Sequence, residues 1–71
     1  MGDEIMGTYV VEYSYSQRAW HIDTLDSAIT RNIDDMLEGR VNDYKIINMF
    51  GSYELANEWL ERFIKELEKR K

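Results

Sequence analysis

Residues 8–23 alternate between two kinds of side chain, and this alternation constrains the fold more than any other feature of the sequence. Large apolar residues occupy every second position from Tyr9 to Tyr15, and the same spacing returns at Trp20 and Ile22. A period of two is the repeat of a β-strand, in which successive side chains point to opposite faces. The pattern therefore predicts two strands, joined in a hairpin.

The hairpin turn determines which residues face each other across the two strands. A loop of two residues and a loop of four give the same register, in which Tyr13 pairs with Trp20 and Glu12 with His21. The turn contains no glycine, so the sequence leaves the length of the loop open. In either case one face of the hairpin is aromatic and aliphatic. The other face carries Val10, Glu12, Ser14, Ala19, His21 and Asp23.

Two helices and a third strand are expected in the rest of the chain. Apolar residues recur at helical spacing over 24–38, and Gly39 then supplies a left-handed C-terminal stop. Tyr44–Phe50 indicates a strand with apolar residues on both faces. After Ser52 an apolar stripe lies opposite a charged face, which is typical of an amphipathic helix.

Seventy-one residues suffice for one small domain, so we expect a single α+β domain of order ββαβα at 8–71, after a flexible lead-in at 1–7. A right-handed crossover over a central first strand gives a three-stranded antiparallel sheet of order 2-1-3. We expect both helices to pack on one face, the aromatic one. The other face would then stay open, and because small sheets rarely tolerate this, we expect a homodimer that covers it.

Charge and composition exclude several classes of function. Fourteen acidic and nine basic residues give a net charge of -5, which opposes attraction to nucleic acid and to anionic membranes. The chain has no cysteine and one histidine, which argues against disulfide frameworks, cysteine nucleophiles and the usual zinc sites. No apolar run is long enough to span a bilayer. We therefore expect a cytoplasmic protein without metal or cofactor and without direct nucleic-acid binding.

The acidic residues of the first helix form a candidate surface for a partner. Asp34, Asp35 and Glu38 share its outer face, and Asp43 follows in the next loop. A row of carboxylates can imitate phosphates and occupy a nucleic-acid-binding groove on another protein. Arg31 interrupts this row, and an ordinary solvated helix face is the alternative interpretation.

His21 is the only side chain whose ordinary pKa lies near neutrality, and the register places it across from Glu12. A carboxylate beside an imidazole can support acid–base chemistry or weak metal binding. No nucleophile and no metal motif accompanies the pair, so we assign no catalytic residue and no metal ligand. Glu12 and His21 are expected to form a polar pair on the open sheet face.

These observations favour a small, acidic, non-enzymatic interaction protein that inhibits or regulates another macromolecule, with a protein as partner, by occupying its surface. Short acidic domains without cysteine are common among accessory proteins of viruses and mobile elements, which is the setting expected here. The alternative is a protein that binds or sequesters a nucleotide-like small molecule at a dimer interface. Its anion contacts would come from Arg18, Arg31, Arg40 or Lys45.

Overall fold

The computed structural model describes residues 7–70 and has the predicted element order ββαβα. Of the lead-in expected at 1–7, all but Gly7 lies outside the described residues. The elements are β1 (Tyr9–Ser14), β2 (Ala19–Thr24), α2 (Leu25–Leu37), β3 (Tyr44–Phe50) and α3 (Tyr53–Lys69).

The three strands form an antiparallel sheet of order β2-β1-β3, which confirms the predicted topology. The predicted hairpin register is also confirmed, since Tyr13 pairs with Trp20 and Glu12 with His21. The loop has four residues, and its last one, Arg18, takes a φ of 53°. Arg18 thus adopts the left-handed conformation that glycine more often supplies in such turns.

A β-bulge in β3 explains why this strand is apolar on both faces. The pairing with β1 shifts between Val11 and Glu12, and Ile47 is the extra residue on β3. On the Val10 face of the sheet β3 therefore presents Ile46 and Met49.

Helix α3 covers the aromatic face of the sheet. Its Ala56 and Leu60 pack against Val11 to form the buried core, with Trp20 and Phe50 among the partly buried residues around it. The side-chain oxygen of Ser52 accepts a hydrogen bond from the Leu55 N–H and so caps the start of the helix.

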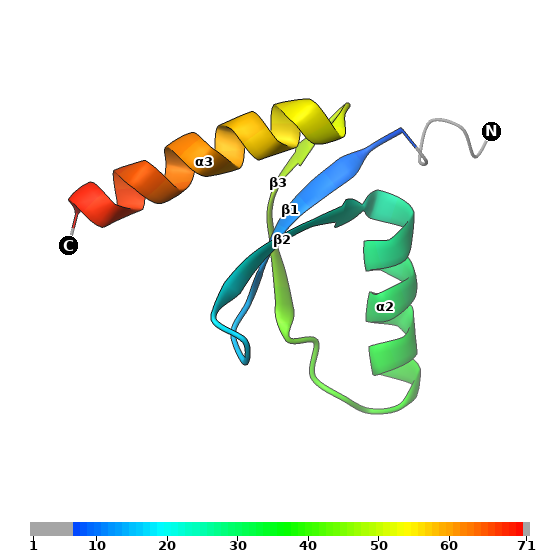
Figure 1. Cartoon of the computed structure of the whole chain (residues 1–71). Coiled ribbons are helices and arrows are strands. Elements are labelled where there is room, and N and C mark those ends of the chain that lie inside the picture. The colour runs from blue at the N-terminus through cyan, green and yellow to red at the C-terminus, as the bar shows by residue number, and fades with distance from the viewer. Residues whose placement is uncertain (1–6, 71) are drawn as a thin grey trace.

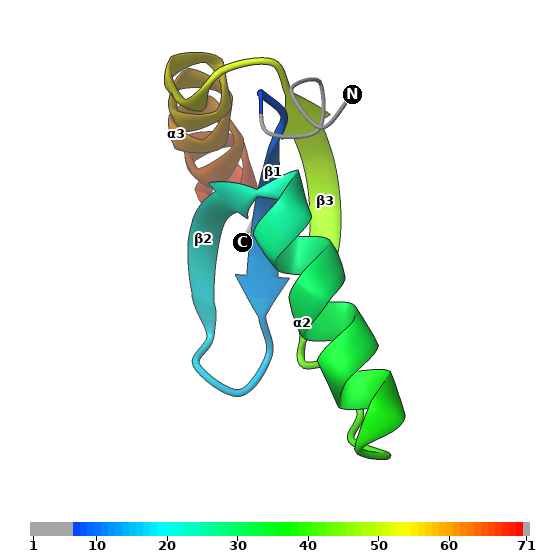
Figure 2. The same ribbon diagram turned by 90° about the vertical axis from the view of Figure 1, so that its right-hand side faces the viewer.

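Helix α2 lies on the opposite face, so the prediction that both helices pack on one face is wrong. In Figures 1 and 2 the sheet runs between the two helices. Ala28 of α2 is fully buried, and Arg31 reaches Glu12 on β1, whose side chain points away from α3. With both helices on the aromatic face, Val10 and Glu12 would meet solvent; in the observed arrangement they are 0% and 1% exposed. Since α2 covers this part of the sheet, the open face that suggested a homodimer is absent over β1.

Local capping accounts for where α2 begins and ends. Thr24 is the last residue of β2, and it caps the helix by accepting a hydrogen bond from the Ser27 N–H. At the other end Gly39 has a φ of 74°, and the N–H groups of Gly39 and Arg40 donate to the carbonyls of Met36 and Asp35. This is a Schellman motif, in which the left-handed residue is usually glycine.

Candidate interaction surfaces

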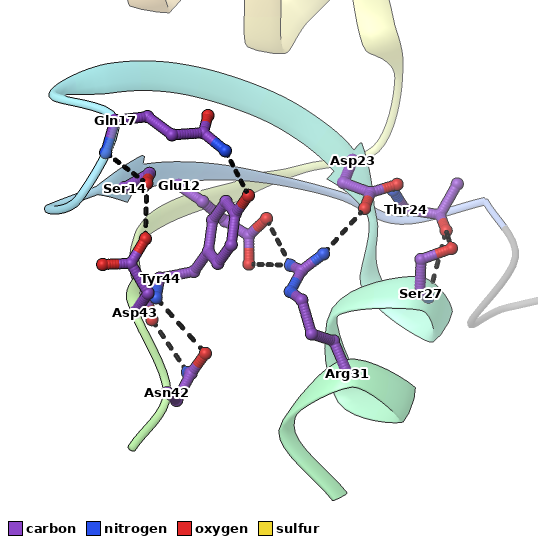
Figure 3. Close-up of polar contacts among 10 residues, drawn as sticks. All are labelled: Glu12, Ser14, Gln17, Asp23, Thr24, Ser27, Arg31, Asn42, Asp43 and Tyr44. Carbon is purple, nitrogen blue, oxygen red and sulfur yellow. Dashed lines mark hydrogen bonds and ion pairs between the residues drawn. The ribbon is translucent and has the colours of Figure 1, made fainter. Parts of the chain in front are cut away.

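A polar cluster lies between α2 and the sheet, where Arg31 holds the buried carboxylate of Glu12 (Figure 3). Arg31 Nη2 donates to both oxygens of Glu12, at 2.7 and 2.6 Å, and Nη1 donates to Asp23 at 3.3 Å. The Tyr44 ring lies 4.2 Å from the guanidinium carbon, in a cation–π contact. Burial disfavours the charge of Arg31, but the contacts with Glu12 and Asp23 outweigh it and raise the pKa of Arg31. The cluster fastens α2 to β1 and β2.

The predicted pair of Glu12 and His21 lies on neighbouring strands, but other residues bind the two side chains. The Glu12 carboxylate contacts Arg31, whereas His21 Nε2 is 2.8 Å from Gln17 Oε1. The His21 ring also lies 5.6 Å from that of Tyr44. The Glu12 carboxylate is buried under α2, whereas His21 stays partly exposed beside Gln17.

The acidic residues proposed as a partner surface are largely engaged within the chain. Arg40 binds Asp35 through Nη2 at 3.0 Å, and it also binds Glu38. Asp34 and Asp35 border a shallow hollow of about 460 Å³ that Arg31 and Arg40 also line. The row is therefore interrupted by cations at two positions, which weakens its resemblance to a run of phosphates.

The Asp43 side chain forms hydrogen bonds with the hairpin turn. Its carboxylate accepts hydrogen bonds from the hydroxyl of Ser14 and from the N–H and hydroxyl of Ser16 (Figure 3 shows the Ser14 contact). These bonds, that from Ser14 foremost, lower the pKa of Asp43 below its ordinary value. The residue links the loop before β3 to the hairpin turn.

Of the four cations considered as anion contacts, only Arg31 and Arg40 line the same hollow. Arg31 and Arg40 are paired with carboxylates of this chain. Arg18 lies in the hairpin loop, and Lys45 lies opposite Tyr13 on β3. The described residues thus offer no cationic cluster at these positions for a phosphate group.

An open groove that the sequence did not reveal lies between the sheet and the C-terminal half of α3. Figure 1 shows α3 running outward past the sheet toward its C-terminus. The groove measures about 550 Å³ and is lined by residues of all three strands, of the hairpin loop and of the C-terminal end of α3. We call it the aromatic groove; its lining residues are Tyr13, Tyr15, Trp20, Ile47, Ile64, Leu67, Glu68 and Arg70.

The rings in the aromatic groove are held by contacts with other rings. Tyr13 meets Tyr15 and Trp20 edge to face, with ring centroids 5.5 and 4.9 Å apart. Trp20 in turn meets Phe63 of α3 at 5.5 Å. These packed rings form a surface that needs little reordering to accept a ligand.

Ile64 and Leu67 belong to the apolar stripe of the last helix, and the length of α3 is the signal in the sequence that could have revealed the groove. A helix of 17 residues is about 25 Å long, whereas strands of six residues span about 20 Å. A helix that crosses such a sheet must extend beyond it at one end.

A second exposed apolar area lies on the other side of the molecule, along α2, the following loop and β3. Its members are between 37% and 93% exposed. We call it the α2–β3 surface; it consists of Ile29, Ile33, Met36, Leu37, Val41, Ile46 and Met49.

Comparisons with known proteins return no relative: no family model matches the chain, and neither the curated proteins nor the solved structures contain a match. Within residues 7–70 no helix is long and apolar enough to cross a membrane. The same residues contain no group of three or more His, Cys, Asp and Glu side chains placed to hold a metal ion.

Proposed function

We propose that this protein is a non-enzymatic interaction protein that inhibits or regulates another protein by occupying part of its surface, in the cytoplasm. The observation that carries the proposal is the aromatic groove, which presents Tyr13, Tyr15 and Trp20 beside Arg70. Tyr, Trp and Arg are the residues most enriched at the energetic centres of protein interfaces.

The residues that line the groove favour a projecting apolar side chain of a protein as its occupant. Ile47, Ile64 and Leu67 line it together with the rings, and Glu68 and Arg70 stand as the charged lining residues. An apolar centre beside polar residues is the usual arrangement of a protein interface. A nucleic acid is a poorer occupant, because the net charge is -5 and the rings meet one another edge to face instead of offering parallel faces to bases.

A random-peptide display library, selected against the immobilised protein, tests the proposal. We expect enrichment of peptides with an aromatic or large aliphatic anchor, and loss of their binding to Leu67→Glu, which places a carboxylate in the groove. Leu55→Glu is the matched control, since it makes the same change in the same helix at a residue that is 53% exposed outside the groove. Circular dichroism of both variants establishes that they fold.

The acidic row provides the competing site within the same experiment. If the selected peptides bind Leu67→Glu as well as they bind the unaltered protein, the groove is not the site. If they are instead lost on Asp34→Lys with Glu38→Lys, the acidic face of α2 binds the partner. A library that yields no specific peptide argues against an apolar peptide as the occupant.

A small-ligand binder is the second candidate function, and the volume of the groove favours it. About 550 Å³ lies within the range of roughly 300–1,000 Å³ typical of small-molecule sites. A nucleotide-like or other planar aromatic compound that binds there should raise Tm in proportion to its concentration, and Leu67→Glu should abolish the rise. No change in Tm across a panel of nucleotides and planar heterocycles would exclude these ligands.

A further inference from the structure

We infer that the α2–β3 surface is the interface between two copies of this chain, which pack face to face about a two-fold axis. The interface lies on the opposite side of the sheet from the aromatic groove, so the two surfaces can be tested separately.

The side chains of the α2–β3 surface come together because of the way α2 is rotated on the sheet. Arg31 points toward the sheet, where it binds Glu12 of β1 and Asp23 of β2 and lies against the ring of Tyr44 at the start of β3. Ile29, Ile33 and Met36 follow one another at spacings of four and three and occupy the opposite flank. They therefore lie away from the side chains that bind Arg31.

On the sheet side, β3 presents Ile46 and Met49 to the same area. Both residues pair with β1 residues of the face that α2 covers, Ile46 with Glu12 and Met49 with Val10. They remain 37% and 54% exposed because α2 contacts mainly β1 and β2. A flank of α2 and a face of β3 thus border one uncovered apolar area.

The size of this area is sufficient for a specific dimer. The exposed fractions of the seven side chains correspond to roughly 600 Å² of apolar surface. Two copies would then bury about 1,200 Å², the lower end of the range for stable protein–protein interfaces.

Charge also favours a second copy over a partner of opposite charge. All seven side chains of the surface are uncharged, while Asp34, Asp35 and Glu38 lie on other flanks of α2. Two acidic copies can approach here without opposing rows of carboxylates, and the surface offers no charge for a heterologous partner to recognise.

The small size of the buried core explains why this chain would gain stability from a partner. Among the described residues, the buried apolar side chains are Val10, Val11, Ala28, Ala56 and Leu60. Domains of this size gain the missing apolar burial through disulfides, metals or oligomerisation, and this chain has no cysteine. Another copy of the same chain is present whenever the chain is made.

The backbone of β3 argues against the other way of forming a dimer, in which β3 strands pair edge to edge. The side chain of Asn42 binds both the N–H and the carbonyl of Tyr44, at 3.2 and 2.8 Å. The Met49 N–H donates to Asn48 Oδ1 at 2.8 Å. Because these groups are occupied and Ile47 forms a bulge, the outer edge is poorly prepared to accept another strand.

Sedimentation equilibrium of the full chain tests the inference. We expect a monomer–dimer equilibrium for the unaltered protein as its concentration rises from micromolar to millimolar. Met36→Lys and Val41→Lys should each weaken the dimer at least tenfold, because each places a charge in the interface. Both residues are largely exposed in the single chain, at 71% and 93%, so the substitutions should not disturb the fold. Leu55→Lys is the matched control and should dimerise like the unaltered protein.

A spectroscopic measurement and a further variant distinguish loss of the face-to-face dimer from loss of the fold and from edge-to-edge pairing. Near-ultraviolet circular dichroism of Trp20 and Trp59, which lie on the α3 side, reports whether each variant keeps its fold. Asn42→Ala frees the backbone of Tyr44, so it should leave a face-to-face dimer unchanged and strengthen an edge-to-edge one. The inference is overturned if the protein is a monomer at all concentrations. It is also overturned if the protein forms a dimer that Asn42→Ala strengthens and Met36→Lys leaves intact. Neither result bears on the aromatic groove or on its peptide test.

Discussion

Arg31 and Glu12 form the contact that decides the arrangement of α2 at the level of single residues. The Glu12 side chain is 1% exposed, and a buried carboxylate without a cation is strongly unfavourable. Arg31 satisfies both of its oxygens from a helix that begins far along the chain. The pair was not evident in the sequence, because Arg31 appears there as an interruption of an acidic helix face.

Replacing Arg31 by methionine should lower the free energy of unfolding by about 3 kcal/mol, because Glu12 would keep its burial and lose its partner. The double variant Glu12→Met with Arg31→Met should recover most of this loss, since it removes both charges and leaves apolar side chains of similar volume. Urea unfolding of the three proteins provides the values. Equal losses in the single and double variants would show that burial of the uncompensated carboxylate is not the cause.

Asp43 should make folding stability depend on pH. Its pKa is lowered in the folded protein from an ordinary value of 3.8, so its contribution is present above that value and is lost as the pH falls through the folded pKa. We expect Asp43→Asn to be less stable than the unaltered protein at neutral pH, and the difference to shrink as the pH falls through the folded pKa of Asp43. A difference that stays constant from neutral to acidic pH would assign the effect to geometry rather than charge.

At the scale of elements, the hairpin loop and the end of α2 each contain one residue in the left-handed conformation, but only the residue at the end of α2 is a glycine. Arg18 adopts it at φ 53° with a side chain that makes it unfavourable, whereas Gly39 adopts it at φ 74° without cost. A Cβ added to Gly39 would meet no atom within 4 Å, so only the backbone conformation opposes a side chain there.

Arg18→Gly should therefore raise the stability by about 0.5 kcal/mol, because relief of strain exceeds the added entropy of the unfolded chain. Gly39→Ala should lower it by about 1 kcal/mol. Thermal unfolding of both variants provides the test. If both substitutions shift Tm in the same direction, backbone conformation does not control these two positions.

At the scale of the whole molecule, two layers of helix on a three-stranded sheet leave apolar area uncovered on both sides. The aromatic groove lies under the end of α3, and the α2–β3 surface lies beside α2. Because the buried core is small, association at either surface would contribute noticeably to the stability of the fold.

If the chain dimerises through the α2–β3 surface, its Tm should rise with protein concentration, because mass action favours the folded dimer. Met36→Lys should show a lower Tm that does not change with concentration. Differential scanning calorimetry over a hundredfold range of concentration measures both. A concentration-independent Tm for the unaltered protein would mean that folding and association are not coupled.

Much of the fold follows from local patterns in the sequence. The period-two alternation of Tyr9–Tyr15 and its return at Trp20 determine the hairpin and its register, whichever loop length applies. The bounds of β3 and the capping of both helices likewise depend on residues close together in the chain. Such features are predictable because periodicity and capping act over a few residues.

The face on which α2 packs, and therefore the surfaces left for binding, was decided by the tertiary structure. Helix periodicity identifies an apolar stripe, but it does not say which sheet face the stripe meets or how much of it stays exposed. The pairing of Arg31 with Glu12, nineteen positions away, settles the first question, and the outward course of α3 creates the aromatic groove. Both depend on contacts between distant segments, whose energies no local pattern contains.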